Sequence, residues 1–134
     1  MGLSEKEKKS IVKYRLDKAK DALFDVTISI QNCRWNNAAN RLYYACFYAA
    51  MALLIHDGYE ARTHNGVKTL LGIHYVNTGM IEEALINAYR KMFNLRQTGD
   101  YDDLIVINKD DVLRLLEPAK QFIKTIENLI YKIN

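Results

Sequence analysis

Apolar residues recur along most of the chain at alternating steps of three and four positions, which is the spacing of one face of an α-helix. The first such series extends over about five turns, and its members are Val12, Leu16, Ala19, Leu23, Val26 and Ile30. Ser4 and Glu7, just before this series, have the spacing of a capping box, in which two polar residues close the start of a helix. The pattern therefore predicts a first helix over residues 5–31.

The second helix is predicted from an almost continuous apolar run, residues 42–55. Asn36 or Asn37 can cap its start, and Gly58 is a glycine of the kind that follows a helix end. The run is shorter than the roughly 20 residues that cross a membrane, and it carries three tyrosines. A helix that is apolar on all sides is usually covered by its neighbours. We therefore expect a central helix in a bundle and no membrane contact.

Two further helices follow from the same kind of spacing. Thr63 can cap a short third helix whose apolar set ends at Val76, and a fourth helix is predicted over residues 80–97. The next stretch, residues 97–108, contains Gly99 and three aspartates. Because glycine and aspartate favour turns and loops, the pattern predicts a loop there.

A fifth helix is predicted from the last apolar series, which begins at Val112 and ends at Ile133. Asn108 can cap its start. Pro118 inside the series removes one main-chain hydrogen bond, so we expect a kink or a short break near it. No alternating strand pattern, internal repeat or low-complexity segment interrupts these helices. The sequence predicts an all-α fold, an up-and-down bundle of four to five helices in a single domain over residues 1–134.

Composition excludes several kinds of site. Two cysteines, Cys33 and Cys46, are too few for a disulfide framework or a four-cysteine zinc site. The sequence contains no glycine-rich phosphate loop, EF-hand or metal-binding histidine pair, so we expect no metal and no cofactor. The N-terminus lacks the apolar core of a secretory signal, and we therefore expect a cytoplasmic protein.

Charge is concentrated near the start of the chain. The net charge of +3 permits nucleic-acid binding without indicating it. Residues 1–20 hold seven Lys and Arg against three Asp and Glu. Solvated helix faces account for such a balance, and a basic first helix could also approach RNA or an acidic partner.

A set of residues from the second helix onward has an order and spacing found in a known family. The positions are Ala39-x-Arg41-Leu42-Tyr43-Tyr44-Ala45-x-Phe47, Ala49-x-x-Ala52-Leu53-Leu54, Gly58, His64-x-Gly66, Thr78-Gly79 and Leu95-Arg96-Gln97-x-Gly99-Asp100-Tyr101. Over residues 8–132 the chain resembles the HEPN domain family, in particular its small stand-alone bacterial and archaeal members, which are often encoded beside a minimal nucleotidyltransferase. The resemblance implies a helical bundle that forms a homodimer, in which a polar motif from each protomer meets in a cleft at the interface.

For active family members, the resemblance implies a ribonuclease motif in which an arginine is followed, after four to six residues, by a histidine. Such a histidine takes the proton of the RNA 2′-hydroxyl, and the arginine stabilises the charge that develops on the phosphate. None of the seven arginines of this chain has a histidine at that spacing. In the nearest match, Arg96 to Tyr101, Asp100 stands where the histidine would be, and a carboxylate of ordinary pKa is a weak base. The sequence therefore does not predict a working ribonuclease.

Two interpretations of this segment stay open. Arg96, Asp100 and Tyr101 form a polar site carried over from the family, or Arg96 and Asp100 form an ion pair that ends the fourth helix at Gly99. His64 is a further catalytic candidate, and the alternative is a structural hydrogen bond near a helix start. Three residues of the second helix are candidates for binding a nucleotide or RNA together with Arg96: Arg41, Tyr44 and Tyr48. The alternative is that they are ordinary core side chains whose polar ends have hydrogen-bond partners.

Three functions are compatible with these patterns. The first is a dimeric HEPN protein that is the non-nuclease or weakly active partner of a nucleotidyltransferase in a toxin–antitoxin-like module, with Tyr101 as a candidate for adenylylation by that enzyme. The second is a metal-independent endoribonuclease in which Asp100 or His64 replaces the missing histidine. The third is a nucleotide-binding module. We favour the first because the resemblance covers nearly the whole chain while the catalytic spacing is absent.

Overall fold

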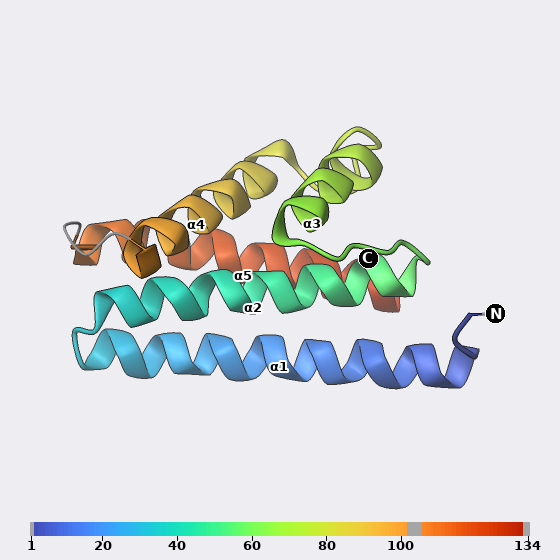
Figure 1. Ribbon diagram of the computed structural model, residues 1–134, viewed down its shortest axis with the longest axis horizontal. Helices are drawn as coiled ribbons and strands as arrows, with labels where there is room; N and C mark the ends of the chain where they lie inside the picture. Colours follow the sequence, from blue (N-terminus) through green and yellow to red (C-terminus); the bar gives the residue numbers. More distant parts are fainter. Residues whose placement is uncertain (1, 102–105, 133–134) are drawn as a thin grey trace.

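The computed structural model describes residues 2–101 and 106–132, except for the side chain of Tyr101. Its elements are α1 (Glu5–Gln31), α2 (Trp35–His56), α3 (His64–Leu71), a π-helical turn η1 (Gly72–Val76), α4 (Glu83–Tyr101) and α5 (Lys109–Tyr131). No strand occurs within these two ranges. The predicted all-α bundle is confirmed. Figure 1 shows α2 between α1 on one side and α3 and α4 on the other, and α5 also packs against α2.

The first helix has the predicted bounds because its start and its buried face are both encoded locally. Ser4 Oγ accepts a hydrogen bond from the Glu7 main-chain N–H, and the Glu7 carboxylate accepts one from the Ser4 N–H. This capping box satisfies two donors that a helix start leaves without partners. The apolar series faces the core, where its buried members are Val12, Leu16, Ala19 and Val26.

The second helix is the centre of the bundle, and eleven of its residues are buried. By length and apolar content alone it could also cross a membrane, and 61% of that apolar window is buried inside the bundle. Burial against α1, α4 and α5 therefore accounts for its apolar character. Cys46 lies at its middle, fully buried, and burial raises the pKa of this thiol.

The expected asparagine cap of α2 is wrong. The cap is Arg34, two residues before Asn36, and it makes no capping hydrogen bond with its side chain. Both asparagines bind elsewhere: Asn36 Oδ1 accepts from the Ile107 N–H at 3.2 Å, and Asn37 Nδ2 donates to Ser29 Oγ at 2.6 Å. These tertiary contacts use the side-chain groups that a cap would need.

The fourth helix differs most from its predicted range, because it continues through Gly99 instead of ending there. Gly99 is covered by Ile107: a Cβ built at Gly99 would lie 2.5 Å from Ile107 Cδ1. The glycine therefore permits a close approach of the segment before α5 and does not stop the helix. The turn glycines are elsewhere, at Gly58 and Gly79, whose φ angles are 85° and 77°.

The third and fifth helices begin at their predicted caps. Thr63 Oγ1 accepts from the Gly66 N–H at 2.9 Å. Asn108 and Asp111 form a second capping box, with hydrogen bonds of 3.0 and 3.1 Å. The break expected near Pro118 does not occur, since α5 is continuous through it. The packing of its buried face against α2 and α4 offsets the one lost main-chain hydrogen bond.

Candidate functional site

Arg96 lies on the face of α4 that packs against α2, and its side chain is only 12% exposed. Its Nε is 2.9 Å from Asp100 Oδ2, one turn later on the same helix. Its Nη2 donates to the Tyr44 hydroxyl on α2 at 3.0 Å, and the guanidinium lies 5.2 Å from the centre of the Tyr44 ring. The ion pair predicted between Arg96 and Asp100 is therefore present, and it lies inside the helix instead of ending it.

A second arginine joins this group through an asparagine that sequence reasoning missed. Asn40 Nδ2 donates to Asp100 Oδ2 at 3.1 Å, and Arg41 Nε donates to Asn40 Oδ1 at 3.1 Å. Asn40 lies one helical turn before Tyr44, so the two share a face of α2. That spacing was the available signal. The Arg41 guanidinium also lies over the Tyr44 ring, at 5.2 Å from its centre.

His64, the first residue of α3, reaches the same group through the tyrosines of α2. Its Nδ1 is 2.7 Å from the Tyr43 hydroxyl, and its ring stacks on Phe47 with 4.4 Å between the ring centres. The edge of its ring faces Tyr44 at 5.9 Å. Burial, and next the positive charge of Arg96, lower the pKa of His64, so its imidazole is neutral at neutral pH.

Hydrogen bonding sets which nitrogen of His64 carries the proton. The buried Tyr89 hydroxyl donates to the Tyr43 oxygen at 3.5 Å, and we assign the Tyr43 hydrogen to the 2.7 Å bond with Nδ1 of His64. Burial raises the pKa of Tyr43 to about 12, so this hydroxyl keeps its proton. A neutral imidazole that accepts at Nδ1 has its hydrogen on Nε2. In this tautomer His64 presents an N–H donor at Nε2, and its basic lone pair, at Nδ1, faces the Tyr43 hydroxyl.

We call the seven connected residues the Arg96 cluster: Asn40, Arg41, Tyr43, Tyr44, His64, Arg96 and Asp100. Tyr48 lies at its edge, with its ring centre 5.9 Å from that of Tyr44. The Lys18 amine of α1 lies over the Tyr48 ring, 5.1 Å from its centre. The side chain of Tyr101, the remaining candidate, lies outside the described residues. The structure thus brings together every other residue that the sequence predicted for the site.

The chemistry of the Arg96 cluster is that of a polar contact surface. Two guanidinium groups and the Nε2–H of His64 are donors suited to an anionic or carbonyl oxygen. The Asp100 carboxylate counters part of their positive charge, because it pairs with Arg96. Among the described residues, no group of histidine, cysteine and acidic side chains could hold a metal ion.

Comparison with known proteins places the chain in a family. A family model described as HEPN domain matches residues 12–129. A UPF0332 protein of Thermotoga maritima is 36% identical over 92% of this chain and 94% of its own length. "Putative toxin MJ0605" of Methanocaldococcus jannaschii is 30% identical over 86% of this chain and 85% of its own length. "Putative toxin MJ0142" of the same organism is 33% identical over 71% and 65%. Since the family match covers most of the chain, the protein belongs to the HEPN domain family.

Proposed function

We propose that this protein is the toxin-like component of a two-gene, toxin–antitoxin-like module. In this proposal it acts as a homodimer, binds a minimal nucleotidyltransferase as its partner, and has little or no ribonuclease activity of its own. Support for the module comes from the HEPN family and from the relatives whose names include the word toxin. The observation that carries the absence of nuclease activity is the 2.9 Å ion pair between Arg96 and Asp100.

RNA cleavage without a metal needs a base for the 2′-hydroxyl and a cation for the phosphate. In the Arg96 cluster the cation is paired with a carboxylate, which would repel a phosphate group. Asp100 is occupied by Arg96 and Asn40, and His64 presents a donor at Nε2. The cluster therefore supports recognition of a partner better than proton abstraction.

Dimerisation through this surface would place two copies of the Arg96 cluster on either side of a two-fold axis. In a symmetric interface the same patch meets itself, so each guanidinium can approach the Asp100 carboxylate of the second copy. Figure 1 shows that the end of α4 lies beside the start of α2, at the end of the bundle away from both chain termini. A second protomer could contact this end without displacing either terminus.

The test begins with a search for a minimal nucleotidyltransferase gene beside this one, whose absence would contradict the proposal. The two proteins are then co-expressed and analysed by size-exclusion chromatography with light scattering. We expect a homodimer of the protein alone and a stable complex with the enzyme. Arg96→Gln should weaken both, whereas Lys91→Gln, a charge change at an exposed position of α4, should leave both intact. A monomer at micromolar concentration together with no complex would contradict the proposal.

One observation favours a second candidate, a metal-independent endoribonuclease: the neutral His64 contacts the same tyrosines as Arg96. A change in the hydrogen bond to Tyr43 would leave Nε2 free to accept a proton. Incubation of structured RNA with the wild-type protein, His64→Asn and Arg96→Ala in the presence of EDTA separates the two functions. Cleavage that both variants abolish would favour the nuclease, and cleavage equal in all three would be contamination.

A further inference from the structure

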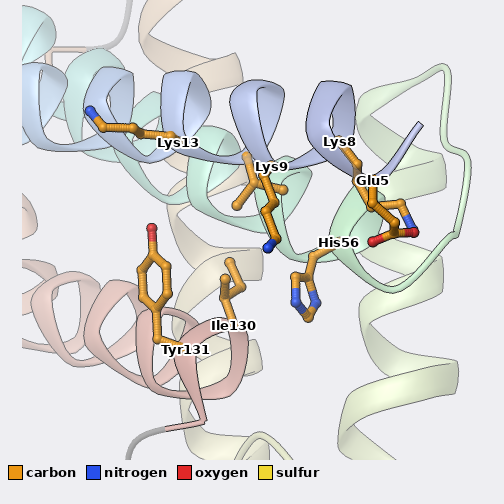
Figure 2. A pocket seen from close by; sticks show the side chains of 8 residues that line it. Glu5, Lys8, Lys9, Lys13, His56, Ile130 and Tyr131 are labelled. Atoms are coloured by element: carbon orange, nitrogen blue, oxygen red, sulfur yellow. The ribbon is translucent and has the colours of Figure 1, made fainter. Parts of the chain in front are cut away.

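A cavity of about 450 Å³ lies at the other end of α2 from the Arg96 cluster. Its walls come from the start of α1, the end of α2 and the end of α5, which are far apart in the sequence (Figure 2). Its volume is within the usual range of small-molecule sites. Because three helices enclose it, the cavity is a tertiary feature and not a groove along one helix.

Positive charge dominates the cavity wall. Lys8, Lys9 and Lys13 line it against a single carboxylate, Glu5, and the Lys13 ammonium pairs with Asp17 of the same helix at 2.8 Å. Lys8 pairs with Glu5 at 3.5 Å, but the Glu5 side chain is 82% exposed, so solvent screens this pair. No carboxylate within the described part of the chain pairs with Lys9. Figure 2 shows the Lys9 side chain extending from α1 into the space beside His56 and Ile130.

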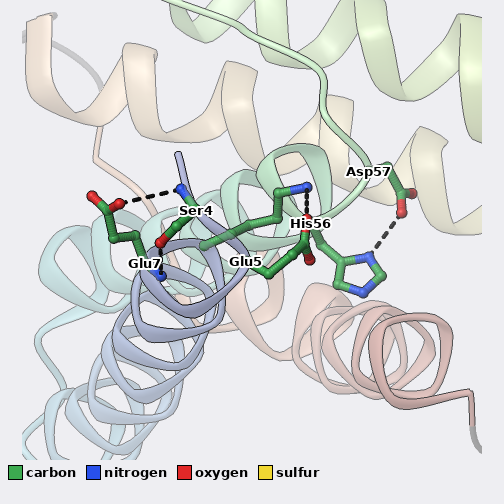
Figure 3. A network of polar contacts seen from close by, with 6 residues as sticks. Ser4, Glu5, Glu7, His56 and Asp57 are labelled. Carbon is green, nitrogen blue, oxygen red and sulfur yellow. Dashed lines mark hydrogen bonds and ion pairs between the residues drawn. The ribbon is translucent and has the colours of Figure 1, made fainter. Parts of the chain in front are cut away.

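His56, the last residue of α2, contacts Asp57, which in turn accepts a hydrogen bond from a buried tyrosine. Its Nδ1 lies 2.8 Å from Asp57 Oδ1, and the Tyr75 hydroxyl donates to Asp57 Oδ2 at 2.6 Å. A carboxylate only accepts hydrogen bonds, so Nδ1 carries a proton. Figure 3 shows this pair near Glu5, which pairs with Lys8. The His56 ring is therefore held in one orientation, with its N–H directed at Asp57, and it forms a fixed part of the cavity wall.

The rest of the wall is apolar. Val12 and Ile130, 4% and 6% exposed, close the inner side, and the half-exposed ring of Tyr131 stands opposite α1. An anion bound by the lysines would thus lie next to surfaces that suit a flat or apolar group. A bare inorganic ion would leave that part of the cavity unused.

We propose that this cavity binds a small organic phosphate. The ammonium groups of Lys8 and Lys9 bind the phosphate oxygens by charge-assisted hydrogen bonds. Ile130 and the Tyr131 ring contact the apolar or aromatic group attached to the phosphate. This site is separate from the Arg96 cluster, and its occupation requires neither the dimer nor the nucleotidyltransferase.

The experiment titrates the full chain with two probes, inorganic pyrophosphate and ADP, by calorimetry and by amide NMR shifts. We expect saturable binding of both, tighter for ADP, with the largest shifts at Lys9, Val12 and Ile130. Lys9→Gln should weaken ADP binding about tenfold, because it removes one charge-assisted contact. The control Lys91→Gln removes the same charge from the exposed face of α4 and should change affinity by less than about twofold.

Four outcomes would overturn the proposal. The first is no saturable shift with either probe up to about 10 mM, which is weaker than a specific site requires. The second is equal weakening by Lys9→Gln and Lys91→Gln, since the binding would then follow only net charge. The third is a set of shifts centred on the start of α2, near the Arg96 cluster. The fourth is Lys9-dependent binding of an RNA without terminal phosphate, which would replace a small ligand by nucleic acid.

Discussion

At the scale of single residues, His64 couples the stability of the protein to pH. Burial and the charge of Arg96 lower its pKa in the folded state, while in the unfolded chain it takes up a proton near its ordinary pKa of about 6.5. Below that pH the unfolded state binds more protons than the folded state. The stabilising contribution is therefore complete above about pH 6.5 and decreases as the pH falls.

The measurement is the free energy of unfolding in urea, at about pH 7.5 and at about pH 5.5, for the wild type and for His64→Asn. On acidification we expect the free energy of unfolding to decrease more in the wild type than in the variant, since the variant has no imidazole at this position. Equal losses in the two proteins would mean that the charge of His64 is not linked to folding.

Contacts between the candidate residues could be predicted only where the partners lie within about one helical turn of each other in the sequence. Arg96 and Asp100 are one helical turn apart, so their ion pair follows from the sequence. Tyr43, which is fully buried, has the pattern of an ordinary core residue, and nothing in that pattern indicates its bond to His64, 21 positions away. Asn40 shares a helix face with Tyr44, but no local pattern indicates its bond to Asp100, which is 60 positions away.

At the scale of elements, the chain segment before α5 determines how far α4 extends. Gly99→Ala should gain about 1 kcal/mol in helix propensity. The new Cβ would overlap Ile107, which is buried with Ala38, Ala39 and Val112, so we expect a net destabilisation of about 1–2 kcal/mol. Ile107→Val removes the overlapping methyl group, and in that background Gly99→Ala should cost less or stabilise.

Urea unfolding of the wild type, the two single variants and the double variant measures this coupling. Gly72→Ala is the matched control, because Gly72 has helical φ and ψ angles and a Cβ there would meet only Arg90 Nη2, at 3.7 Å. The control should be neutral or stabilising. Additive effects of Gly99→Ala and Ile107→Val would mean that Ile107 does not explain the glycine.

The sequence predicts a helix boundary where a capping residue marks it. It does not predict a boundary that depends on a contact with a residue distant in the sequence. Ser4, Thr63 and Asn108 act within three residues of themselves, and all three helices begin as predicted. The start of α2 and the end of α4 depend instead on Ile107, which binds Asn36 and covers Gly99. Ile107 is 71 positions from Asn36, so the local periodicity of the sequence does not indicate their contact.

At the scale of the whole molecule, the bundle should open as one unit around α2. This helix contacts α1, α3, α4 and α5, so its amides cannot be exposed while the rest stays packed. We expect native-state hydrogen exchange to be slowest over residues 42–54 and to follow global unfolding there. Amides of α3 and η1, which pack on fewer neighbours, should exchange faster. Protection of α3 equal to that of α2 would contradict this order of stability.

The apolar character of α2 also has a consequence during synthesis. Its covering helices α4 and α5 come last in the chain, and translation at about 5–20 residues per second delays them by several seconds. In that interval only α1, made just before, can shield the emerging α2. We therefore expect the packing of α1 on α2 to limit contacts between the exposed apolar residues of α2 and other nascent chains.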